Sequence, residues 1–171
     1  MLPLNMSNVD TDQIMPKQFL KRVERSGYGE FLFYDWKKEH DFPLNNEAYQ
    51  GSKVLVAGDN FGTGSSREHA PWGLQDWGFD AIISTKFADI FRLNSINIGL
   101  VPIETNQENI DALFAKIEVN PKTKIEISIE NKTVQCEEIT FSFDLDDFSQ
   151  KRILEGLDKI CLLYTSPSPR D

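Results

Sequence analysis

Residues 53–64 read Lys53-Val54-Leu55-Val56-Ala57-Gly58-Asp59-Asn60-Phe61-Gly62-Thr63-Gly64. The opening apolar and β-branched run is typical of a short strand buried on both faces. The part that follows is too rich in glycine for regular structure. A helix is predicted to begin at Ser65 or Ser66, because serine is a good N-cap, and to end near Gly78. The pattern is strand, glycine-rich loop, helix.

The same alternation continues toward the C-terminus. Further strands are predicted at 81–84 and 99–103, and helices at 87–93, with Phe87, Ile90 and Phe91 at core spacing, and at 109–117. After Pro121 the apolar period changes to two, which predicts a β-hairpin from residues 125–130 and 133–136, before a last helix near 148–157. The fold class is therefore α/β, with a parallel layer plus antiparallel strands.

Composition narrows the function. The chain has 171 residues, enough for one domain, and its 18 Lys and Arg against 27 Asp and Glu give a net charge of −9. This acidity argues against nucleic acid or an anionic membrane as partner, and no apolar run is long enough to span a bilayer. Cys136 and Cys161 cannot form a disulfide scaffold or a metal cluster by themselves. Without a signal-peptide pattern at Met1, we expect a cytoplasmic protein.

Residues 62–70 carry the most informative chemistry: Gly62-Thr63-Gly64-Ser65-Ser66-Arg67-Glu68-His69-Ala70. Backbone N–H groups of a glycine-rich turn that opens a helix favour an anion, and Arg67 can hold a carboxylate or phosphate bidentately. The hydroxyls of Ser65 and Ser66 could bind the anion or move a proton. The alternative is structural, with Ser66 as an N-cap and Arg67 on a solvated face. The loop fails the patterns of a Walker loop, a dinucleotide fingerprint and a nucleophile elbow.

This loop resembles the active-site loop of the swivelling domain in the aconitase superfamily. Residues 8–14 (Asn8-Val9-Asp10-Thr11-Asp12-Gln13-Ile14), 31–36 (Phe31-Leu32-Phe33-Tyr34-Asp35-Trp36) and 56–62 extend the match, as do residues 87–91 and 99–103. Together they are similar to the small subunits of bacterial isopropylmalate dehydratases, from about Asn5 to Ile160. The resemblance implies the swivelling β/β/α domain of that superfamily.

The resemblance also implies an activity and a partner. Members are two-subunit hydro-lyases that interconvert 2-isopropylmalate and 3-isopropylmalate through isopropylmaleate, in leucine biosynthesis. A [4Fe–4S] cluster is expected in the large subunit, with no cofactor and no metal on this chain. By position, Ser65 resembles the catalytic base. Gly64, Ser66, Arg67 and Asp12 resemble the residues that bind the dicarboxylate substrate.

Other positions are weaker candidates. Asp10 and Thr11 accompany Asp12 as supporting residues, and His69 is expected to make a structural hydrogen bond near the site. Residues Phe31, Leu32 and Phe33 resemble a loop that selects the substrate side chain, with core packing as the alternative.

The two ends depart from the pattern. Residues 162–171 have two prolines and no periodicity, so we expect a domain of residues 1–161 followed by a non-native or disordered tail. At the other end, the short strand that usually precedes Asn8 in relatives is expected to be missing.

Two rival functions remain. One is the small subunit of a related hydro-lyase acting on homoaconitate, dimethylmalate or citraconate, and the other is a non-catalytic anion-binding module.

Overall fold

The computed structural model describes residues 1–19, 21, 27–64, 68–155 and 161–164. One sheet in this part of the chain is entirely parallel, and its spatial order follows the chain order. Its strands are β1 (Leu2–Leu4), β2 (Val54–Ala57), β3 (Ala81–Ser84) and β4 (Val101–Glu104). Leu2 aligns with Leu55, Val56 with Ile83, and Ile83 with Ile103. The predicted parallel layer is confirmed.

The expectation that the chain lacks a strand before Asn8 is wrong, because β1 pairs with β2. Pro3 obscures this strand in the sequence, since proline cannot donate to a ladder. Both edge strands of the sheet contain a proline, Pro3 in β1 and Pro102 in β4. An edge strand has one unpaired side, which is where a missing N–H is tolerated.

Helices connect successive parallel strands, α2 (His69–Trp77) between β2 and β3 and α3 (Asp89–Asn97) between β3 and β4. Another helix, α4 (Gln107–Val119), follows β4 and leads out of this sheet. The described part of α2 begins at His69 rather than at Ser65 or Ser66, with Glu68 as its N-cap. Pro71 fits this boundary. A helix that began at Ser65 or Ser66 would need an N–H from residue 71, which proline lacks, whereas proline is tolerated in the first turn of a helix that begins at His69. Gly78 ends α2 as predicted.

A second sheet is antiparallel, in the order β7-β6-β5-β8. It contains the predicted hairpin, β5 (Ile125–Ser128) and β6 (Thr133–Cys136), and also β7 (Ile139–Ser142) and β8 (Cys161–Tyr164). β8 pairs with β5, so the backbone of residues 162–164, expected to be tail, has a partner strand. The helix α5 (Asp147–Glu155) precedes it. The origin of the tail beyond Tyr164 stays a prediction.

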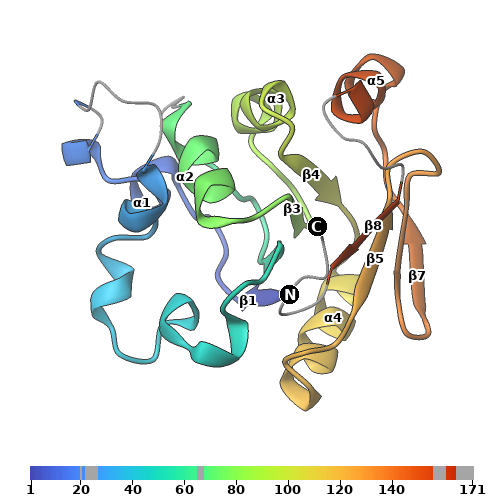
Figure 1. The fold of residues 1–171 in the computed structure, drawn as a ribbon, viewed down its shortest axis with the longest axis horizontal. Helices are drawn as coiled ribbons and strands as arrows, with labels where there is room; N and C mark the ends of the chain where they lie inside the picture. Colours follow the sequence, from blue (N-terminus) through green and yellow to red (C-terminus); the bar gives the residue numbers. More distant parts are fainter. Residues whose placement is uncertain (20, 22–26, 65–67, 156–160, 165–171) are drawn as a thin grey trace.

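The segment between β1 and β2 is built from short turns. It contains the single-turn helix α1 (Thr11–Ile14) and 3₁₀ turns at Lys17–Phe19, Tyr28–Phe31, Trp36–Lys38, Pro43–Asn45 and Glu47–Tyr49. Aromatic rings fill the space between them: Phe33 stacks on Trp36 with centroids 5.8 Å apart, and Phe42 lies 5.7 Å from Phe33. This layer covers one face of the parallel sheet (Figure 1).

The parallel sheet separates two apolar cores, because successive side chains of a strand point to opposite faces. Val54 and Val56 face the core shared with α4 and the antiparallel sheet, whereas Leu55 and Ala57 face α2 and the aromatic segment. Ile90 was expected in the core of α3 but is 52% exposed, while Phe87 and Phe91 are buried. The parallel sheet thus lies between two packed layers, and the loop after β2 leaves its carboxyl edge.

Candidate functional site

The glycine-rich loop after β2 is paired along its length with the segment after β1. Gly58 N donates to Met6 O at 3.0 Å, and Asn8 N donates to Asp59 O at 2.8 Å. Farther along, Gly62 N and Thr63 N donate to Val9 O at 2.7 and 3.1 Å. The parallel β1–β2 pairing therefore continues past the strand ends and into the loop.

This pairing ends where the motif of residues 8–14 meets the loop motif of residues 62–70. Thr11 N donates to Thr63 O at 2.8 Å, and Asp10 forms an isolated parallel bridge with Thr63. Gly64 follows with φ +89°, and a Cβ added there would lie 3.2 Å from Asp10 Cβ and 3.6 Å from Thr11 Oγ1. A side chain would strain this backbone and crowd Asp10. The structure thus brings together Asp10, Thr11 and Gly64.

Asp10 is held by a capping box at the start of α1. Its Oδ1 accepts from Gln13 N at 2.9 Å, while Gln13 Oε1 accepts from Asp10 N at 3.0 Å. Asp12 follows in the first turn, is exposed, and accepts a hydrogen bond from Lys17 N at 3.0 Å. Asp10 is therefore a structural support, and Asp12 lies on the surface of the same short helix.

The turn between β3 and α3 holds the loop from the other side. Ser84 Oγ, fully buried, donates to Gly58 O at 2.6 Å, and Thr85 Oγ1 donates to Asp59 Oδ1 at 2.6 Å. Phe61 N donates to Lys86 O at 2.8 Å. Neither Ser84 nor Thr85 was predicted as a site residue. Their place directly after a predicted strand, at the same sheet edge as the loop, was the available signal.

Ser65, Ser66 and Arg67, the residues predicted to act on substrate, lie outside the described residues. The described chain ends at Gly64 on one side and resumes at Glu68 on the other. Gly64 is exposed, at the carboxyl edge of the parallel sheet, where α/β folds bind ligands. The roles assigned to these three residues stay predictions.

His69, the first residue of α2, lies among aromatic rings. Its imidazole is 5.3 Å from the Tyr28 ring in an edge contact and 4.6 Å from the Trp72 ring. Tyr28 is fully buried, so this contact anchors the start of α2 to the aromatic segment. The packing supports the structural role expected of His69, and the predicted hydrogen bond stays a prediction.

Phe31, Leu32 and Phe33 divide into two groups. Leu32 and Phe33 are fully buried in the core beside α2, so the alternative of core packing describes their surroundings. Phe31 is half-buried, and its ring stacks on Phe19 at 4.2 Å with 13° between the planes. A part in substrate selection therefore stays a prediction, and Phe31 is its strongest candidate.

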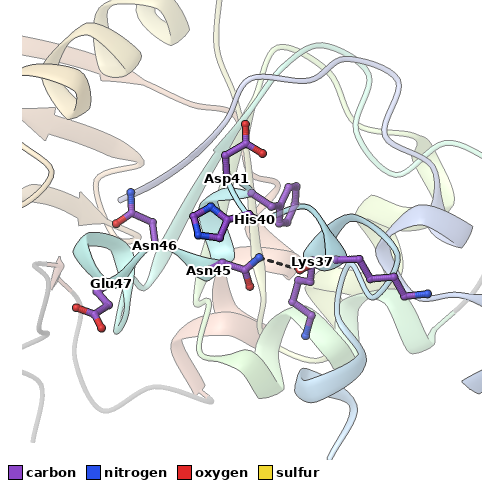
Figure 2. A pocket seen from close by; sticks show the side chains of 8 residues that line it. Lys37, His40, Asp41, Asn45, Asn46 and Glu47 are labelled. Carbon is purple, nitrogen blue, oxygen red and sulfur yellow. Dashed lines mark hydrogen bonds between the residues drawn. The ribbon is translucent and has the colours of Figure 1, made fainter.

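A surface groove of about 720 Å³ runs along residues 37–47 and contains none of the predicted site residues (Figure 2). Asn45 Nδ2 donates to Lys37 O at 2.8 Å and to Glu39 O at 2.9 Å. Lys37 Nζ donates to Glu30 O at 2.6 Å, and burial lowers the pKa of this lysine. These polar groups hold the 3₁₀ turns together rather than converging on the groove.

The described residues of this chain do not fit a metal cluster. Within them, no three His, Cys, Asp or Glu side chains are grouped so that they could hold a metal ion. Cys136 is buried in the core, and burial, with Glu137 adding to it, raises the pKa of its thiol to about 11. A thiol that stays protonated is a poor iron ligand.

In the same part of the chain, none of the helices has the length and apolar character needed to span a bilayer.

Comparisons with known proteins agree with this architecture. The family described as Aconitase C-terminal domain matches residues 1–108. The 3-isopropylmalate dehydratase small subunit of Salinispora arenicola is 49% identical over 160 residues, covering 94% of this chain and 82% of the relative. The small subunit from Micrococcus luteus is 48% identical over 161 residues, covering 94% of this chain and 80% of the relative. A crystal structure of 3-isopropylmalate dehydratase from Methanocaldococcus jannaschii aligns with a TM-score of 0.67 at 27% identity, covering 91% of this chain and 87% of that one.

Proposed function

The chain belongs to the family of 3-isopropylmalate dehydratase small subunits, and we propose that its loop after β2 supplies the proton-transfer and carboxylate-binding groups of this hydro-lyase. The reaction interconverts 2-isopropylmalate and 3-isopropylmalate by dehydration to isopropylmaleate and rehydration. The observation that carries the proposal is the 2.8 Å bond from Thr11 N to Thr63 O, which joins the two motifs beside Gly64.

Ser65 acts as the base. Its Oγ, as an alkoxide, takes the proton from the carbon next to the one that bears the hydroxyl and becomes a serine hydroxyl. The substrate hydroxyl leaves as hydroxide, so the proton held on Ser65 and the departing hydroxide together make up the water that is lost. Rehydration returns a proton to carbon. A serine hydroxyl is a weak acid in water, so the alkoxide needs backbone N–H donors, a cationic neighbour and a site that excludes water. Arg67 offers the cationic neighbour. The backbone donors come from Gly64 and the residues after it, because the N–H groups of Gly62 and Thr63 already donate to Val9 O.

Arg67 and Ser66 bind substrate carboxylate, with the guanidinium of Arg67 donating two parallel hydrogen bonds. Asp12, exposed on α1, completes the polar side of the site. Phe31 supplies an apolar contact for the isopropyl group, in place of the donors that a third carboxylate would need. This combination of polar contacts for the carboxylates and an apolar contact for the side chain favours isopropylmalate over substrates with a third carboxylate.

The partner is the large subunit. We place the [4Fe–4S] cluster there, because the described residues of this chain offer no ligand set for it. A cytoplasmic location is part of the proposal.

The test is anaerobic co-expression of this chain with its large subunit, followed by isopropylmaleate formation measured from ultraviolet absorbance. Ser65→Ala is expected to lower kcat by roughly 10²–10⁴-fold, the usual contribution of a positioned base, while the subunits still co-purify. Ser142→Ala, at an exposed position of β7, is the matched control and keeps full activity.

Three results would contradict the proposal. Wild-type turnover by Ser65→Ala would remove the base assignment. Turnover of homoaconitate, dimethylmalate or citraconate without turnover of isopropylmalate would move the chain to a related hydro-lyase. Ligand binding without turnover of any of these acids would leave a non-catalytic anion-binding module.

A further inference from the structure

Two asparagines on different loops share an uncommon backbone conformation and bond to each other. Asn8 and Asn60 both have φ 58°, in the left-handed region that non-glycine residues seldom occupy. Asn60 Nδ2 donates to Asn8 Oδ1 at 3.0 Å, and Asn8 N donates to Asp59 O at 2.8 Å. We call this pair the asparagine clasp. Left-handed residues held by such contacts concentrate at functional sites, where the surrounding structure stabilises them.

The clasp lies where the parallel pairing of the two segments continues beyond the ends of β1 and β2. Immediately beyond it, Val9 O accepts from Gly62 N and Thr63 N, and Thr63 O accepts from Thr11 N. Each left-handed residue turns its segment in the same sense, so the two backbones stay side by side as they leave the sheet. The clasp therefore sets the register in which Asp10 and Thr11 meet Gly64.

We infer that Asn8 and Asn60 are positioning residues for the reaction, an inference that rests on the proposed function. They act through the backbone of the loop and not by touching substrate. The base at Ser65 follows Gly64 directly, so a shift in this register moves the base relative to the bound acid. A displacement of about 1 Å at a reacting group can lower the rate by about 100-fold.

Glycine gives a clean deletion at both positions. It adopts positive φ without strain, so Asn8→Gly and Asn60→Gly remove the hydrogen bond between the two side-chain amides and leave the backbone conformation accessible. Each single variant is expected to lower kcat by about 10-fold, with KM within about threefold of wild type, because misplacing the base weakens the transition state more than substrate binding.

The decisive experiment is a double-mutant cycle on the complex with the large subunit. If the two asparagines act through their shared bond, the double variant loses no more kcat than either single variant, because the first change already removes the bond. Lys132→Gly is the matched control, since Lys132 also has a positive φ, 56°, but lies in the turn between β5 and β6. It is expected to keep wild-type kcat.

Amide hydrogen exchange on this chain provides a second readout that does not depend on activity. The amides of Thr11, Gly62 and Thr63 should exchange faster in Asn60→Gly than in the wild type. Their exchange rates should be unchanged in Lys132→Gly. If the wild-type complex does not turn over isopropylmalate, the proposed function fails, and the exchange rates alone test the clasp. Unchanged exchange in Asn60→Gly overturns the inference, as do wild-type kcat values in an active complex or single-variant losses that multiply in the double variant.

Discussion

Ser84 Oγ donates a 2.6 Å hydrogen bond to Gly58 O, and Ser84 is fully buried. This bond joins the end of β3 to the first residue of the loop that follows β2. Gly58 is packed so closely that an added Cβ would lie 2.7 Å from the carbonyl carbon of Met6. The start of the loop, at Gly58, is therefore held between the segments that follow β1 and β3.

Ser84→Ala should destabilise the protein. It leaves the carbonyl of Gly58 without this buried donor, a loss that typically costs about 1–3 kcal/mol. Urea unfolding followed by circular dichroism measures the change. Ser142→Ala removes an exposed hydroxyl from β7 and should change the unfolding free energy by less than about 0.5 kcal/mol. Equal stability of the two variants would show that the Ser84 bond contributes nothing.

Gly62→Ala and Gly64→Ala should separate stability from activity. At Gly62, φ +85° and a Cβ 2.6 Å from Phe91 Cβ combine backbone strain with overpacking, so we expect a loss of about 3 kcal/mol or more. At Gly64 the added Cβ meets Asp10 at 3.2 Å on an exposed loop, so the loss is about 1–2 kcal/mol. Activity at Gly64 should nevertheless fall by about 10-fold, since Asp10 and Thr11 must move.

Thermal unfolding and steady-state kinetics on both glycine variants provide the comparison. Adding Phe91→Ala to Gly62→Ala removes Cγ and Cδ1, two of the three Phe91 atoms nearest to the new Cβ, so the double variant should be partly rescued and lose less stability than the two single losses added together. The absence of any rescue would argue that backbone strain alone sets the cost.

Arg67→Lys tests the carboxylate-binding role. Lysine keeps the charge but cannot make two parallel hydrogen bonds, so kcat/KM should fall by about 100-fold, the equivalent of one charged hydrogen bond. The measurement is steady-state kinetics with 3-isopropylmalate. A variant with wild-type kcat/KM would show that charge alone suffices, and the bidentate geometry would be wrong.

Cys136 should resist alkylation in the folded protein. Its pKa is raised to about 11 because burial disfavours the thiolate, so at pH 8 only about 0.1% of the thiol is ionised. In a Cys161→Ser background, iodoacetamide at pH 8 should label Cys136 slowly, faster as pH rises toward 11, and rapidly in denaturant. Rapid labelling of the folded chain at pH 8 would contradict the buried environment.

Local patterns predicted most of the regular structure. Residues 81–84 form β3 as predicted, and the alternation of Ile125 and Ile127 with Glu126 predicted the hairpin, because a period of two requires only neighbouring residues. Ile90 was misplaced because helical spacing does not say which side of α3 meets a neighbour. β7 was missed although Ile139 and Phe141 alternate with exposed Thr140 and Ser142, because the run is only four residues long and its apolar side chains are only partly buried.

By itself, the sequence determined the alternation of strand, glycine-rich loop and helix that begins at residue 53, and the motif that identifies the family. These depend on residues that are close along the chain. Only the tertiary structure decided that Asp10 bridges to Thr63, that Ser84 bonds to Gly58, and that Asn8 bonds to Asn60. The physical reason is parallel pairing: β2 lies between β1 and β3, so the chain segments that leave all three strands meet at one edge of the sheet.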